Sequence, residues 1–186
     1  MNWKEYLVMS EKTMSTEFHC DSKDERLLHA VIGILTEIEE LLDNHDIDKS
    51  PDEVGRSEEV IDALWYCAII SREFDIDYPQ IITKMPNEDP MGLIVKIIKN
   101  TCKLLDMLKK KLYYNRPIDE NNFKTIFHLI LLNFSDYANC YNINLEKSFD
   151  VNIAKLKARY NGDKFSSERA INRDLQTERN ILEGNN

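Results

Sequence analysis

The chain contains few residues that interrupt a helix, with five glycines and five prolines among 186 residues. Folds rich in β-strands use such residues at their many turns, whereas long helices exclude them from their interiors. Apolar residues also recur at helical spacing. In the segment 24–45 they form a stripe made of Leu28, Val31, Leu35, Ile38 and Leu42, widened by Leu27, Ala30, Ile34 and Leu41. No segment alternates with the period of a strand, so the sequence predicts an all-α fold.

Helical periodicity and capping residues together predict seven helices. We expect them at 2–15, 24–45, 53–75, 90–114, 119–141, 144–160 and 166–183. Serine followed by proline or acidic residues is typical of a helix start, as at Ser50-Pro51-Asp52 and Ser166-Ser167-Glu168. Asn161-Gly162-Asp163 indicates a break between two helices.

A weak internal repeat suggests how these helices pair. Residues 34–43, ILTEIEELLD, align with 97–106, IIKNTCKLLD, and REFDID at 72–77 resembles NCYNIN at 139–144. Two helix pairs of this kind can pack as a four-helix bundle. Chance similarity between amphipathic helices is the alternative. We expect a single all-α domain over 1–186, made of a first half (1–85), a repeat-like second half (86–145) and C-terminal helices (146–186).

Charge and composition exclude several classes of protein. The formal net charge of −9 disfavours non-specific binding to nucleic acid or to an anionic membrane. The N-terminus lacks the pattern of a signal peptide, and no apolar run approaches the roughly 20 residues needed to span a bilayer. We therefore expect a cytoplasmic protein. The four cysteines form no CxxC pair, which predicts reduced thiols rather than a zinc site or disulfides.

Two pairs of acidic residues stand beside apolar surface on successive predicted helices. Glu37 and Glu40 form the first pair, and Glu59 and Asp62 form the second. Residues three apart share a helix face, so an antiparallel turn between the helices would let the pairs converge. Solvated faces are the alternative, and for a single such pair they are the usual one. Carboxylates buried together repel one another and take up protons unless a cation compensates their charge.

The residue types indicate which cation would suit these acids. Carboxylates without histidine or cysteine partners favour Mg²⁺, with Mn²⁺ as a substitute, over zinc. A di-iron bundle would require Glu-x-x-His pairs, and the sequence contains none. Magnesium holds several waters and commonly bridges carboxylates to the phosphates of a substrate.

The same residues resemble those of the MazG-like all-α nucleoside triphosphate pyrophosphohydrolases. This superfamily also includes dimeric dUTPases, dCTP pyrophosphatases and phosphoribosyl-ATP pyrophosphohydrolase. HAVIGILTEIEELLD (29–43), SEEVIDALWY (57–66) and EYLVMSEKTM (5–14) are similar to segments of the family, and so is the tail at 152–179. The likeness covers most of 5–75 and about 145–183. Glu39 and Ile61 stand where the family usually has glycine, and neither is a ligand position.

The resemblance implies roles for individual residues. Glu37, Glu40, Glu59 and Asp62 would coordinate Mg²⁺ and carry catalysis, with one of them accepting the proton of the attacking water. Residues that would contact the nucleotide are Tyr66, Asn152, Lys155, Arg159 and His29. Offsets of three and seven place the three tail residues on one helix face, where the two cations can pair with phosphate oxygens. A solvated basic face is the alternative for these three, and a structural histidine is the alternative for His29.

These observations predict a Mg²⁺-dependent enzyme that hydrolyses a nucleoside triphosphate to the monophosphate and pyrophosphate. Two alternatives remain open. One is a helical nucleotide-binding or interaction module without catalysis, and the other is a helical bundle whose acids are only solvated. Related enzymes form dimers or tetramers, so a homo-oligomer is a further expectation. The internal repeat would also allow one chain to imitate a dimer.

Overall fold

The computed structural model describes residues 17–44, 52–79, 88–162 and 164–185. Within them the chain forms seven helices and no strand, which confirms the predicted all-α class. The helices are α2 (Ser22–Asp43), α3 (Glu53–Phe74), α4 (Pro90–Tyr114), α5 (Glu120–Cys140), α6 (Leu145–Tyr160), α7 (Ser167–Ile171) and α8 (Leu175–Glu183). The helix expected at 2–15, the residues Ser50 and Pro51, and Asp163 lie outside the described residues.

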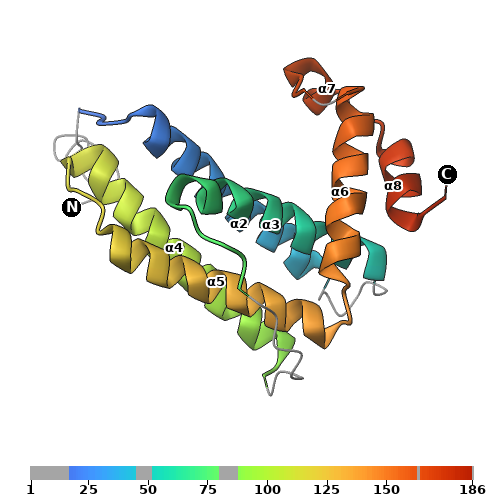
Figure 1. Cartoon of the computed structure of the whole chain (residues 1–186), viewed down its shortest axis with the longest axis horizontal. Helices are drawn as coiled ribbons and strands as arrows, with labels where there is room; N and C mark the ends of the chain where they lie inside the picture. The colour runs from blue at the N-terminus through green and yellow to red at the C-terminus, as the bar shows by residue number, and fades with distance from the viewer. Residues whose placement is uncertain (1–16, 45–51, 80–87, 163, 186) are drawn as a thin grey trace, which may run out of the picture.

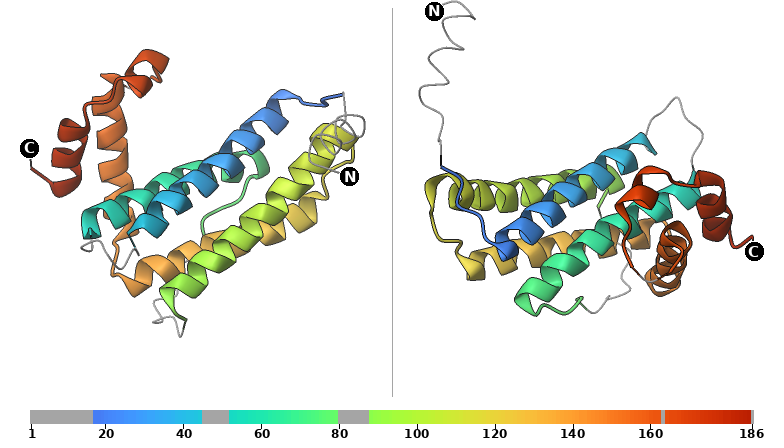
Figure 2. Two further views of the ribbon diagram at one scale, coloured as in Figure 1. Left: turned by 180° about the vertical axis from the view of Figure 1, so that it is seen from behind. Right: turned by 90° about the horizontal axis from the view of Figure 1, so that it is seen from above.

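Four helices pack as two neighbouring pairs. Helix α2 lies beside α3 and α4 lies beside α5, while α2 also contacts α4 and α3 contacts α5 (Figure 1). Helix α6 leaves the end of α5 and runs across the direction of the other four, against α3. Helix α8 returns alongside α6, as the view from above also shows (Figure 2). The α2–α3 pair is therefore in contact with α4 and α5 on one side and with α6 on the other.

The core is built mainly from the apolar faces of these helices. On α2 the fully buried apolar side chains are Leu27, Ala30, Val31, Ile34, Ile38 and Leu41. Leu28, Leu35 and Leu42, which the sequence placed at the centre of the stripe, are only half-buried. The buried face is therefore rotated toward the residues that were expected to widen the stripe. Burying one such aliphatic side chain contributes about 1.5–3 kcal/mol to folding.

A glycine lets α2 and α3 approach closely beside the predicted acids. The ring of Tyr66 on α3 lies over Gly33 on α2, and a Cβ atom at position 33 would be 2.3 Å from that ring. Real Cβ atoms do not approach a neighbour so closely, so the tyrosine ring occupies the volume that any other side chain would need. This contact fixes the spacing of the two helices one turn before Glu37.

Local capping explains the helix ends, including one that the sequence mispredicted. Asp52 caps α3 by accepting a hydrogen bond from the Gly55 amide at 3.0 Å. The single helix expected at 166–183 is wrong, because residues 172–174 separate α7 from α8. Asp174 turns its side chain back to accept a hydrogen bond from the Thr177 amide at 3.1 Å. Such a cap starts a new helix, and here it interrupts the expected one.

The described residues bear on two further expectations, which concern membrane-spanning helices and cysteine thiols. No helix among them combines the length and apolarity needed to cross a bilayer. All four cysteines carry free thiols, as predicted, and Cys67 is buried in the core.

Candidate active site

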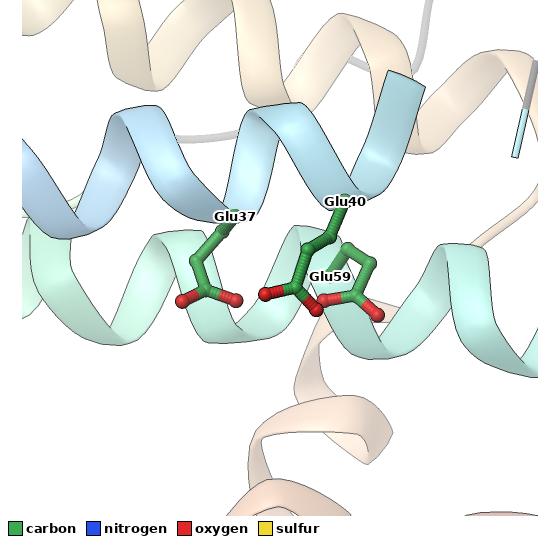
Figure 3. A group of neighbouring side chains, drawn as sticks. All are labelled: Glu37, Glu40 and Glu59. Carbon is green, nitrogen blue, oxygen red and sulfur yellow. The ribbon is translucent and has the colours of Figure 1, made fainter. Parts of the chain in front are cut away.

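Three carboxylates from two helices meet at the edge between α2 and α3 (Figure 3). Glu37 and Glu40 lie one turn apart on α2, and Glu59 extends from α3 beside them. Each residue offers one oxygen atom, and these three atoms lie within 4.8 Å of one another. The three-residue spacing on α2 and the close approach of the two helices bring them together. Three of the four predicted acids therefore lie in one group.

Burial and mutual repulsion perturb two members of this group. Glu59 is half-buried, and burial together with the charges of neighbouring carboxylates, Glu58 first among them, raises its pKa to about 9. Burial, followed by the charges of Asp62 and Glu40, raises the pKa of Glu37 to about 7. Carboxylates behave in this way when they lack sufficient counter-charge. The cluster therefore retains protons at neutral pH, and a cation would have to displace them.

The fourth predicted acid, Asp62, is engaged by helix α6. Its Oδ2 atom accepts a hydrogen bond from the Nζ of Lys155 at 2.6 Å, and its Oδ1 atom accepts one from the amide nitrogen of Asn152. Asp62 still lies close enough for its charge to raise the pKa of Glu37. It therefore forms the boundary between the three-carboxylate group and the residues of α6.

Glu58, which the sequence did not single out, also belongs to this site. Its Oε1 atom accepts a hydrogen bond from the Nζ of Lys155 at 3.0 Å, so the lysine bridges Glu58 and Asp62. The side chain of Lys155 is 0% exposed, and a buried ammonium group is stable only when it is paired in this way. Glu58 precedes Glu59 directly, and the adjacency of two acids was the only signal in the sequence.

Arg159, the third predicted tail residue, has a different partner. Its guanidinium donates hydrogen bonds from Nε and Nη2 to the two carboxylate oxygens of Glu178 on α8, at 2.8 and 2.7 Å. Glu178 is 3% exposed and also accepts hydrogen bonds from Arg173. Burial alone would raise the pKa of Glu178, but its hydrogen bonds with the two arginines lower that pKa to about 2. The structure therefore places Arg159 in an ion-pair network rather than on the carboxylate cluster.

Tyr66 lies one turn after Asp62 on α3, and His29 lies about two turns before Glu37 on α2. The Tyr66 ring packs edge-to-face against the exposed His29 imidazole, with ring centroids 5.4 Å apart. Burial, and then the charges of Glu37 and Asp62, raises the pKa of the Tyr66 hydroxyl. Tyr66 is therefore close enough to the acids to feel their charges, whereas His29 contacts the ring of Tyr66.

No protein-family model matches the chain, and no curated protein or solved structure matches it significantly. The resemblance to MazG-like enzymes therefore remains a prediction from the motif residues. The geometry described above is independent of that resemblance.

Proposed function

We propose that the protein is a Mg²⁺-dependent nucleoside triphosphate pyrophosphohydrolase, which converts a (deoxy)nucleoside triphosphate to the monophosphate and pyrophosphate. The observation that supports this function best is the group formed by Glu37, Glu40 and Glu59, whose oxygens lie within 4.8 Å of one another. Beside it lies the ion pair between Asp62 and the buried Lys155. Carboxylates able to hold a hard cation, next to a fixed positive charge, suit a polyphosphate substrate.

The donor set fits magnesium. All three donors are carboxylate oxygens, which magnesium prefers, and Mn²⁺ has similar requirements. The raised pKa values of Glu37 and Glu59 also indicate a site with too little positive charge. Glu37, Glu40 and Glu59 would hold the ion, with Asp62 at its edge. When bound, Mg²⁺ would neutralise phosphate charge and lower the pKa of a coordinated water.

The residues of α6 would orient the substrate. Lys155 carries its charge beside the carboxylates without the freedom of a surface lysine, because Glu58 and Asp62 both accept hydrogen bonds from it. Asn152 holds the second oxygen of Asp62, so the orientation of that carboxylate is fixed from two sides. The Lys155 side chain is 0% exposed, so it would act on a nearby phosphate through its charge, which would offset part of the repulsion from the acids.

The test is a screen for pyrophosphate release over standard and modified (deoxy)nucleoside triphosphates, with Mg²⁺ and with Mn²⁺. The wild-type chain is compared with Glu59→Gln, which keeps the size of the side chain and removes its charge. Glu39→Gln is the matched control, since Glu39 is exposed and lies outside the cluster. We expect Glu59→Gln to lose at least about 100-fold in turnover while the control keeps it. Normal turnover by Glu59→Gln would refute the assignment.

A second candidate function is nucleotide binding without hydrolysis. It is favoured by one observation, namely that both oxygens of Asp62 are already hydrogen-bonded to α6. Thermal melting with Mg²⁺ and a nucleotide mixture separates the two functions, because ligand binding raises the melting temperature in both. Stabilisation with pyrophosphate release supports the enzyme, and stabilisation without it supports the binding module.

A further inference from the structure

Lys155 divides the five acidic residues of the candidate active site into two groups. Its ammonium nitrogen lies 2.6 Å from Oδ2 of Asp62 and 3.0 Å from Oε1 of Glu58. The other group is the cluster of three carboxylates, whose oxygens lie within 4.8 Å of one another. Burial raises the pKa of Glu37 in that cluster, and the charge of Lys155 partly opposes the rise. A cation that belongs to the chain therefore lies beside the proposed metal site.

The lysine is held among these acids and is not free to turn into water. Its side chain is 0% exposed, whereas those of Glu58 and Asp62 are 17% and 22% exposed. Moving a buried ammonium away from its partners would leave charges of both signs uncompensated. Asn152, one turn earlier on the same face of α6, donates a hydrogen bond to Oδ1 of Asp62 and so orients that carboxylate. The ion pair is therefore a fixed part of the contact between α6 and α3.

The position of this ammonium disfavours a second divalent ion. Two-metal sites hold their ions roughly 4 Å apart, so a second ion would need ligands beside the first. Once the three clustered carboxylates hold one ion, Glu58 and Asp62 are the neighbouring acids that remain. Magnesium lies roughly 2.1 Å from a carboxylate oxygen, so an ion on either oxygen that Lys155 contacts would be within roughly 5 Å of the ammonium. Like charges at that separation repel strongly when bulk water is excluded.

The charge balance of the site leads to the same result. Three ionised carboxylates that hold one divalent ion keep a single negative charge, and the lysine with its two acids keeps another. Lys155 thus supplies part of the compensation that a second ion would give. It does so without removing water from a strongly hydrated cation, which magnesium resists.

We propose that Lys155 takes the place of a second metal ion, so that the chain without substrate binds a single divalent ion at Glu37, Glu40 and Glu59. Glu58 is then a positioning residue, because it holds the lysine and does not contact the metal. The inference rests on the proposed function and adds to it the number of ions and the role of Glu58. Any further ion would enter with the phosphates of the substrate.

The test counts the Mn²⁺ ions that the full chain binds in the absence of nucleotide. Titration calorimetry gives the stoichiometry, and electron paramagnetic resonance distinguishes an isolated ion from a coupled pair. We expect wild type to bind one ion per chain, with the spectrum of an isolated ion and any second ion at least about 100-fold weaker. Two ions of similar affinity in wild type, or the spectrum of a coupled pair, would overturn the inference.

Substitutions at position 155 separate the charge of the lysine from its packing. Lys155→Met removes the ammonium and should raise the stoichiometry to two ions per chain, whereas Lys155→Arg keeps the positive charge and should bind one. Lys157→Met is the matched control, because Lys157 is exposed on the same helix, and it should also bind one. Circular dichroism verifies the fold of each variant. A folded Lys155→Met chain that still binds one ion would contradict the proposal.

A measurement on wild type alone decides the question if a variant fails to fold. Anomalous scattering from crystals soaked in Mn²⁺ gives the positions of the ions. A single peak beside the three clustered carboxylates supports the inference, and any peak in contact with Glu58 or Asp62 overturns it but leaves the proposed function intact. Failure of wild type to bind Mn²⁺ at all would instead refute the proposed function, and with it this inference. The two failures are therefore distinguishable.

Discussion

Binding of Mg²⁺ should release protons, and the number released should fall as pH rises. The pKa of Glu37 is raised to about 7 and that of Glu59 to about 9, so both carboxyl groups hold protons at pH 6. A cation that needs both carboxylates must displace those protons. From these two values we expect about two protons released per site at pH 6 and about one at pH 8.

The same protons weaken metal binding at low pH. If the ion binds only the doubly deprotonated form, its affinity should increase by roughly two to three powers of ten between pH 6 and pH 8. Isothermal titration calorimetry in buffers of different ionisation enthalpy measures both the affinity and the number of protons. Glu39→Gln should behave like wild type, because Glu39 is exposed and outside the group of three oxygens. Release of less than about 0.3 proton at pH 6 would refute this reasoning.

The metal-free protein should show the matching effect on stability. Both native carboxyl groups have pKa values above the ordinary value of 4.5, so the native state binds more protons than the unfolded state between about pH 4.5 and pH 9. Their favourable contribution to the free energy of unfolding is complete below about pH 4.5. It is lost as pH rises through the native pKa values of about 7 and about 9. The free energy of unfolding should therefore fall with a slope of at most about 1.4 kcal/mol per pH unit for each group. Water at their exposed edges reduces this slope.

Three substitutions test the packing around the site, each by urea denaturation. Lys155→Met should destabilise the fold by about 3–5 kcal/mol, because two carboxylates lose their buried partner. Gly33→Ala should destabilise it by about 1–3 kcal/mol through collision with the Tyr66 ring, whereas Gly92→Ala, with nothing within 4 Å, should not. Glu178→Gln should abolish the part of the stability that wild type loses as pH falls from about 4.5 toward 2, and should expose α8 to proteolysis.

The fold was predictable where local signals were sufficient. Helical periodicity located α2 to α5 with ends near those observed, because each buries an apolar face, whereas α6 buries only Leu145, Asn152 and Lys155 and its end was indicated by the Asn161-Gly162 break. The segment 166–183 was mispredicted because its apolar residues are few and its breaks depend on caps. Ser166 caps α7 and Asp174 caps α8, but an aspartate within a polar segment is equally compatible with a helix interior on the solvent side.

The candidate site was predictable only through spacing along single helices. The three-residue interval placed Glu37 and Glu40 together, and the offset of Asn152 and Lys155 placed both on the face of α6 that meets Asp62. The partner of Arg159 could not be inferred in this way. It depends on how α8 folds back along α6, and that contact joins residues 19 apart across the segment that contains α7.

On the proposed function, the charges of the site would require the cation and the substrate to bind together. A connected acidic region is formed by Glu37, Glu40, Glu59, Asp62 and Glu58. Lys155 is paired with Glu58 and Asp62. Fully ionised, these groups carry a formal charge of about −4, which repels a triphosphate of similar charge. One divalent ion halves that charge, and a second removes it. On the proposed function, the carboxylates would therefore accept a polyphosphate only in its cation-bound form.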